Sequence, residues 1–383
     1  MRNRIIRIVF VALFSAMLLV PLLNTNLQDG KVFENEKRKS APMAKLRSED
    51  GTINEDFTAD FETWINDNIG LRSTMILDNA LIQYKLFRVL ANNSNMYLGP
   101  NGELNYATSA MLEDYQHANL FSEEELREIA DGLQYMSDYV KSQDAKFYYY
   151  QCWDKHSIYP EYFPRTVIQT GTESRTDGMI QAFSEYTDVK VISPKKELIE
   201  EKPVKPTYSV WGDPSHWNPR GAYIAYLKLM DAINADSEKP YRVLQESDYT
   251  ITMPDQGEVL FGGIHEVDYI EEFTINDPKA VLTNNKLTFL ADDERHRYFT
   301  NDFADNDTRL LIIGDSYFQG YIVDDIAESF HETIMLWGNF LDDLQPIVEA
   351  YDPDIVVVEA AERINRSKSI LRGVKRIKKS AGT

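Results

Sequence analysis

The feature that most constrains this chain is an apolar run at residues 310–313 that ends in Gly314-Asp315-Ser316. Such a run, bounded by turn residues, predicts a buried strand of an open α/β sheet. The serine then lies just beyond the carboxyl end of that strand, at the edge where open α/β sheets place ligands and reacting groups. The sequence therefore predicts an α/β fold with a nucleophilic serine at the edge of its sheet.

Asp213 and His216, in the segment Gly-Asp-Pro-Ser-His-Trp, supply what such a serine needs. A serine hydroxyl is a weak nucleophile at neutral pH, so it needs a base within hydrogen-bond reach, and the base needs a carboxylate to fix its tautomer. Taken singly, Gly-Asp-Ser and Asp-x-x-His are common in ordinary turns, because Asp and Ser side chains bond to their own backbone. Together they predict a triad of Ser316, His216 and Asp213.

At these residues the chain resembles the SGNH hydrolase-like proteins, and within them the alginate O-acetyltransferase and DHHW group. In that group the Asp-His-Trp block precedes the serine block, a permuted order that this chain shares. Four further segments resemble the group: residues 34–38, 61–72, 154–160 and 356–363. The resemblance implies an SGNH-like open parallel sheet flanked by helices, with the motif order permuted.

The chain departs from the group's pattern in one spacing. The group usually has an Asp two residues before its His, whereas here Asp213 lies three residues before His216 and Ser215 lies immediately before it. A serine cannot be ionised to stabilise an imidazolium, so we favour Asp213 as the orienting group.

The activity implied by the resemblance is O-acyl transfer, with acetylation of a secreted or cell-surface polysaccharide through an acyl-Ser316 intermediate. It also implies a membrane-bound O-acyltransferase as partner. The Ser316 N–H would contribute to an oxyanion hole, and the weaker candidates for oxyanion or substrate contacts are Asn339, Lys155, Tyr159 and Trp217. Two other readings stay open: a carbohydrate acetyl esterase with the same triad, or a non-catalytic polysaccharide-binding or assembly protein whose altered spacing marks a decayed site.

Charge and motif content exclude several other classes. The formal net charge of −21 disfavours nucleic acid as a partner, because phosphates would be repelled. The single Cys152 allows no intrachain disulfide. Nucleotide-binding and zinc-protease patterns do not occur, and His265 and His296 lack metal-ligand spacing. We therefore expect neither a cofactor nor a metal.

The N-terminus predicts the compartment. Arg2, Arg4 and Arg7 precede an apolar run over residues 8–23, the pattern of an export signal. Residues 24–26 are Asn-Thr-Asn rather than a small-residue cleavage site, which favours an uncleaved signal anchor over a signal peptide. The positive-inside rule then leaves the body of the protein at the extracytoplasmic face of the membrane, in the cell envelope.

The expected domain order follows from these signals. Residues 1–25 form the signal anchor or signal peptide, 26–94 a tether and helical lead-in, 95–365 the catalytic domain with a β-rich insertion at about 241–305, and 366–383 a basic tail. Within the domain, Asn101-Gly102 predicts a type I′ hairpin, and Ser122 and Asn218 predict helix starts. The tail has an apolar face that fits either an anionic membrane surface or a solvated tail.

Overall fold

The computed structural model describes residues 2–28, 30–33, 38–48, 51–90, 95–254, 257–261, 264–291, 293–380 and 382. The chain divides into two compact units, Met1–Asn92 with Phe261–Ile264, and Asn93–Leu260 with His265–Thr383. Most of the first segment of the family resemblance, residues 34–37, lies outside the described residues.

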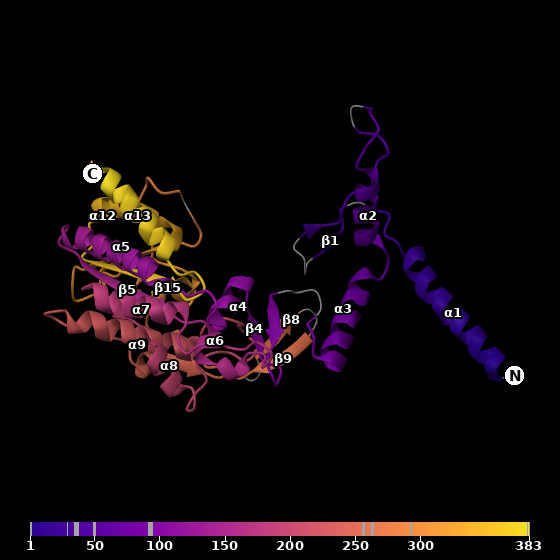
Figure 1. The fold of residues 1–383 in the computed structure, drawn as a ribbon, viewed down its shortest axis with the longest axis horizontal. Helices are drawn as coiled ribbons and strands as arrows, with labels where there is room; N and C mark the ends of the chain where they lie inside the picture. The colour runs from indigo at the N-terminus through magenta and orange to yellow at the C-terminus, as the bar shows by residue number, and fades with distance from the viewer. Residues whose placement is uncertain are drawn as a thin grey trace. The chain divides into compact units, whose positions relative to one another are not determined.

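The N-terminal unit is built from helices α1 (Arg2–Leu23), α2 (Phe57–Asn68) and α3 (Arg72–Ile82), with a π-helical turn η2 (Gln83–Phe87) and a short hairpin of β1 (Val32–Phe33) and β2 (Arg38–Lys39) (Figure 1). In α1, Arg4–Leu23 has a mean hydropathy of 2.5 and is 6% buried, and it is the one described helix long and apolar enough to cross a membrane. The Gly70 N–H donates to Pro21 at 3.0 Å, which ties the end of α1 to the end of α2.

The second unit contains a seven-stranded sheet in the order β11-β12-β14-β13-β15-β5-β6. Neighbours from β14 to β6 are parallel, and β12 and β11 add an antiparallel edge. The strands are β5 (Lys146–Cys152), β6 (Lys190–Ile192), β11 (Val281–Leu282), β12 (Arg297–Thr300), β13 (Arg309–Gly314), β14 (Glu332–Trp337) and β15 (Ile355–Ala361). The predicted apolar strand is β13, at the centre of the sheet, and the predicted fold class is confirmed.

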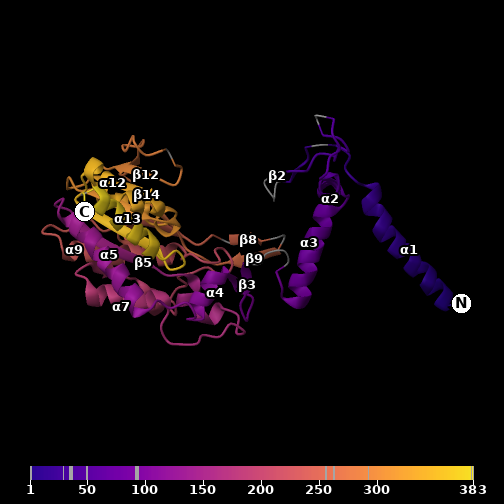
Figure 2. The ribbon, with the colours of Figure 1, turned by 45° about the horizontal axis from the view of Figure 1, so that its top comes forward.

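Helices cover both faces of this sheet (Figure 2). Because side chains alternate along a strand, Leu310 and Ile312 of β13 pack into one core and Leu311 and Ile313 into the other. The first core also receives side chains from α6 (Lys155–Ile158), α8 (Lys195–Glu201), α9 (Pro219–Ala235), α10 (Ser316–Gln319) and α11 (Val323–Ala327). The second receives them from α5 (Glu123–Lys141), α7 (Arg175–Tyr186), α12 (Leu344–Tyr351) and α13 (Ser367–Ser380).

The predicted helix starts are confirmed. Ser122 and Glu125 form a reciprocal capping box at the start of α5, and the Asn218 side chain accepts the Gly221 N–H at 3.0 Å at the start of α9. Both caps satisfy amides that have no acceptor within the helix.

The predicted hairpin forms between β3 (Met96–Leu98) and β4 (Leu104–Tyr106), but its turn is not type I′. A type I′ turn needs positive φ at both central residues, and only Gly102 has one, at 98°. The loop is longer instead, because Leu98 pairs with Leu104, and the Glu103 carboxylate holds it by accepting the N–H of Asn101 at 2.9 Å.

The insertion expected at 241–305 is only partly separate from the sheet. It contains two hairpins, β7 (Tyr249–Thr252) with β10 (Glu272–Ile275) and β8 (Gly257–Phe261) with β9 (Ile264–Asp268). The last part, β11 and β12, instead forms the antiparallel edge of the main sheet. Tyr298 and Phe299 are both buried there, which explains why that part does not stand apart.

The separate basic tail expected at 366–383 is also corrected. Residues Ser367–Ser380 form α13, and its apolar residues Ile370, Val374 and Ile377 are buried in the second core, against α5. The face that would have met a membrane is therefore used inside the domain. The short helix α4 (Ser109–Tyr115) and the 3-10 turns η3 (Pro160–Tyr162), η4 (Glu246–Asp248) and η5 (Gly338–Asp343) complete the described elements.

Candidate active site

Ser316 is the first residue of α10, directly after β13. Asp315 is the N-cap of that helix, and its side chain accepts the Tyr317 N–H at 3.2 Å. Gly314 is required by packing, since a Cβ there would lie 2.6 Å from Oε2 of buried Glu359. The local sequence thus turns the chain sharply from strand to helix and leaves the Ser316 side chain half-buried at the strand end.

The structure brings Ser316, His216 and Asp213 together in one hydrogen-bonded chain. Nε2 of His216 lies 2.8 Å from Oγ of Ser316, and Nδ1 lies 2.9 Å from Oδ2 of Asp213. A carboxylate can only accept, so Nδ1 carries the hydrogen and Nε2 is left to accept the serine hydroxyl. Ser215 is peripheral, with its hydroxyl 3.3 Å from Nδ1.

Tyr321 adds a fourth group to this chain. Its hydroxyl donates to Oδ2 of Asp213 at 2.9 Å, and its ring stacks on His216 at 5.6 Å between centroids. Burial pushes the pKa of Asp213 upward, but hydrogen bonds from His216 and Ser215, with attraction to His216, outweigh it and hold that pKa well below its usual range. Asp213 is therefore ionised at neutral pH.

Arg363 is a cation that sequence reasoning did not assign to the site, although it closes one of the family-like segments. Its Nη2 lies 2.7 Å from Nε2 of His216. Its Nη1 pairs with the buried carboxylate of Asp154, and its backbone N–H donates to the same carboxylate at 3.0 Å. Burial lowers the pKa of Arg363, but the negative charge of Asp154 more than offsets this, so the guanidinium is charged. The place of Arg363 at the end of the family-like segment 356–363 is the one sequence signal that could have pointed to it.

The four weaker candidates lie in two different settings. Lys155, Tyr159 and Trp217 are buried, which leaves them no exposed surface for substrate and corrects that expectation. Lys155 donates to the carbonyls of Leu104 and Val210, and burial lowers its pKa to about 8. The Tyr159 hydroxyl accepts the Thr207 N–H, and the Trp217 ring packs edge-on against Tyr317. Asn339 is exposed in η5, just after the strand β14 that pairs with β13.

Neither His265 nor His296 is expected from the sequence to bind a metal. His296 is buried among aromatic rings, and the side chain of His265 lies outside the described part of the chain.

Comparison with known proteins identifies the fold. No protein-family model matches the chain, and no curated protein does. Among solved structures, PatB1 of Bacillus cereus with a sulfonyl adduct superposes with a TM-score of 0.55 at 18% identity, covering 73% of this chain and 98% of that one. The fold is similar to that of PatB1. A second PatB1 structure gives a TM-score of 0.52 at 16% identity, over 71% of this chain and 96% of PatB1.

The O-acetyltransferase domain of Pseudomonas putida AlgJ is a more distant neighbour, with a TM-score of 0.46 at 13% identity over 70% of this chain and 91% of that domain. A DHHW family protein from Eubacterium siraeum is matched equally distantly, with a TM-score of 0.46 at 15% identity over 73% and 96%.

A buried network under this edge of the sheet fixes the position of the turn that carries Ser316. Oε2 of Glu359 accepts the Asp315 N–H at 2.6 Å, and Oδ2 of Asp315 accepts the Ala361 N–H at 2.9 Å and lies 3.1 Å from Arg366. Burial and the charge of Asp315 raise the pKa of Glu359 far above its usual range. Strand β15 thus holds Asp315 in place through these hydrogen bonds, and Ser316, the next residue, has a fixed position.

Proposed function

We propose that this protein is an extracytoplasmic O-acyltransferase that transfers acetyl groups to hydroxyls of a secreted or cell-surface polysaccharide. The observation that carries the proposal is the hydrogen-bonded chain from Asp213 through His216 to Ser316. A decayed, non-catalytic site would have no reason to keep all three groups in contact, so this geometry favours the enzyme readings.

The reaction proceeds in two half-steps. Nε2 of His216 takes the Ser316 proton as Oγ attacks the acyl carbonyl of the donor, and the imidazolium then returns the proton to the departing group. In the second half, His216 takes the proton of a sugar hydroxyl as its oxygen attacks the acyl-serine, and the imidazolium then returns that proton to the departing Oγ of Ser316. Asp213 keeps His216 in the required tautomer and balances its charge in both halves.

Negative charge develops on the carbonyl oxygen in each half-step, and two groups of this chain are placed to meet it. The Ser316 N–H lies in the first turn of α10, where amides have no intrahelical acceptor. Arg363 competes with Ser316 for the single lone pair on Nε2 of His216, at 2.7 and 2.8 Å. Once the hydroxyl proton has moved to Nε2, the guanidinium loses that acceptor and turns to the oxyanion.

The proposed function also gives roles to the N-terminal helix and to a partner enzyme. The apolar helix α1 holds the catalytic unit at the outer face of the membrane, close to a membrane-bound O-acyltransferase that supplies the acyl group. The esterase alternative differs only in the acceptor, since water would replace the sugar hydroxyl.

The deciding experiment offers detergent-solubilised full-length protein a chromogenic acetyl ester, with and without oligosaccharide, and identifies the products by mass. Wild type should release the chromophore, be labelled by a sulfonyl fluoride at Ser316, and acetylate the oligosaccharide. Ser316→Ala should lose ester turnover and labelling together while keeping its circular dichroism spectrum.

A folded Ser316→Ala variant with undiminished turnover would overturn the site assignment. Free acetate as the sole product, even with excess oligosaccharide, would replace the transferase by the esterase.

A further inference from the structure

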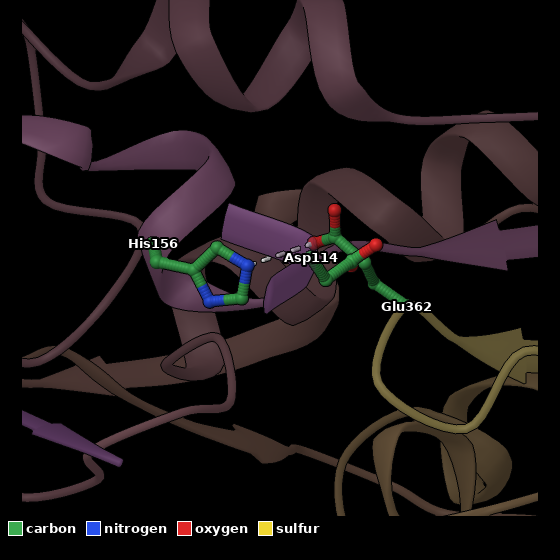
Figure 3. Close-up of side chains that lie close together, drawn as sticks. All are labelled: Asp114, His156 and Glu362. Atoms are coloured by element: carbon green, nitrogen blue, oxygen red, sulfur yellow. Dashed lines mark ion pairs between the residues drawn. The ribbon is translucent and has the colours of Figure 1, made fainter. Parts of the chain in front are cut away.

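Asp114, His156 and Glu362 form a second cluster of titratable side chains, separate from the triad (Figure 3). They come from α4, from α6 and from the residue after β15, three segments far apart in sequence. Their ligand atoms all lie within 4.8 Å of one another, and Nε2 of His156 is 3.9 Å from Oε2 of Glu362. The three residues are 1%, 4% and 0% exposed, so the cluster is buried.

Two members of the cluster, Asp114 and His156, have side-chain atoms without hydrogen-bond partners in the part of the chain that the structure describes. Within the described residues, both carboxylate oxygens of Asp114 and Nε2 of His156 have no hydrogen-bond partner. Buried polar groups without partners are costly, so each such group calls for an explanation. Arg175 approaches Asp114 with Nε at 3.4 Å, but this ion pair does not supply a hydrogen bond to either oxygen. Among the residues described, the Asp114 oxygens and Nε2 of His156 therefore converge without a hydrogen-bond donor between them.

Glu362, by contrast, is held in place by two donors. The Asp154 N–H donates to Oε2 at 2.9 Å and the Ser157 hydroxyl to Oε1 at 2.7 Å. Such outer contacts orient a carboxylate toward a bound ion and are typical of metal sites.

We infer that Asp114, His156 and Glu362 bind a divalent transition-metal ion of the Zn²⁺ type. One imidazole and two carboxylates supply three of the four ligands in the small tetrahedral shell of Zn²⁺, and a water molecule would be the fourth. Mg²⁺ and Ca²⁺ fit less well because they prefer six or more oxygens. Two carboxylates also neutralise the ion. Tetrahedral ligands with bonds of about 2.1 Å lie roughly 3.4 Å apart, so the side chains close by about 1 Å on binding.

The metal site adjoins the triad through the backbone. Glu362 precedes Arg363, and Asp154, whose N–H holds Glu362, pairs with the Arg363 guanidinium. An ion here would fix the segment that directs Arg363 toward His216. Its role is therefore structural support, and metal binding does not depend on the acyl-transfer proposal.

The test measures bound metal directly. Detergent-solubilised full-length protein is stripped with a chelator, dialysed against Zn²⁺, and analysed for metal per chain by mass spectrometry, with Mn²⁺, Mg²⁺ and Ca²⁺ in parallel. Wild type should hold about one Zn²⁺ per chain and gain thermal stability from it. Asp114→Asn and His156→Gln should weaken Zn²⁺ binding by at least about 100-fold, more than loss of an outer contact usually costs.

Two variants serve as matched controls, Glu113→Gln on the exposed side of α4 and His331→Gln, and both should bind as wild type does. The inference is overturned if stripped wild type binds no Zn²⁺ and shows no thermal shift, or if His156→Gln keeps wild-type stoichiometry and affinity. Ester turnover is measured on the same samples, so failure of the metal site is distinguished from failure of the triad.

Discussion

The Asp213 carboxylate accepts more hydrogen bonds than either of its triad partners. It receives the N–H groups of Ser215 and His216 at 2.8 Å, the His216 imidazole and the Tyr321 hydroxyl. Because these contacts favour the ionised form, the same residue orients the base and stabilises the loop that carries it.

Asp213→Asn should lower ester turnover by about 10⁴-fold, because an amide can donate to Nδ1 and so favour the wrong tautomer. Ser215→Ala should have a mild effect. The Asp213→Asn variant should also be less stable than wild type at pH 7. The pKa of Asp213 in the folded protein lies below the unfolded value of about 3.9, so the ionised carboxylate stabilises the fold above that pH. This stabilisation is lost as pH falls through the folded pKa. Turnover assays and thermal unfolding between pH 7 and pH 3 check both points. A larger loss from Ser215→Ala would assign the orienting role to Ser215.

Arg363→Lys should reduce kcat by about 10²-fold, because one ammonium cannot pair with Asp154 and reach the oxyanion together. Arg372→Lys is the matched control, since Arg372 is 54% exposed and pairs with Asp342, which is not part of the triad. Steady-state kinetics tell whether Arg363 stabilises the transition state or binds the substrate. A raised KM with unchanged kcat would mean that it binds the substrate.

The packing of α13 against α5 depends on glycines at the contact. A Cβ on Gly132 would lie 3.0 Å from Ile370, and one on Gly373 would lie 2.8 Å from the carbonyl oxygen of Leu341 and closer still to Met136. Close approach of the two helices therefore requires that these positions lack side chains.

Gly373→Ala should destabilise the protein although alanine is the better helix former, because the backbone at Leu341 must move. Gly178→Ala, in α7, is the control: nothing lies within 4 Å of its Cβ position, so it should stabilise by up to about 1 kcal/mol. Thermal unfolding of both variants measures the change in stability. Stabilisation by Gly373→Ala would show that there is room for a methyl group between Gly373 and Leu341.

Local signals in the sequence predicted the elements well, and long-range pairing explains most of what they missed. The strand before Ser316 and the helix caps at Ser122 and Asn218 are encoded by residues that are close together in the sequence. The apolar face of α13 was visible too, but a basic amphipathic helix has the same periodicity whether it meets lipid or a protein core. The edge strand β12 is defined by its pairing with β14, which no local pattern encodes.

The site was predictable to the same extent. Ser316, His216 and Asp213 stand in recognisable motifs, whereas Tyr321 and Arg363 join them only through the fold. The cluster of Asp114, His156 and Glu362 has no ligand spacing at all, because its members come from three separate segments.

For the molecule as a whole, the proposed attachment to the membrane depends on α1. The formal charge of −21 gives an anionic lipid surface no general attraction for the protein, and α13 keeps its apolar face buried. We expect no second membrane contact at the C-terminus.

Full-length protein should therefore sediment with membranes, stay there in high salt, and be digested by external protease once any wall is removed. Deletion of residues 1–25 with a cleavable export signal in their place should release it into the soluble fraction. A shortened soluble wild-type species would indicate cleavage of α1, and protection from protease in intact cells would place the catalytic unit in the cytoplasm and remove its proposed acceptor.

The two strands at the centre of the sheet are among the last to be synthesised. β13 leads directly into the turn that carries Ser316, and β15 joins β13 to β5, yet both strands follow residue 308. Synthesis from the N-terminus therefore reaches Asp213 and His216 before β15, the strand that links β5 and β6 to β13. A chain that ended before residue 355 would lack this link, and its sheet could not hold Ser316 in place.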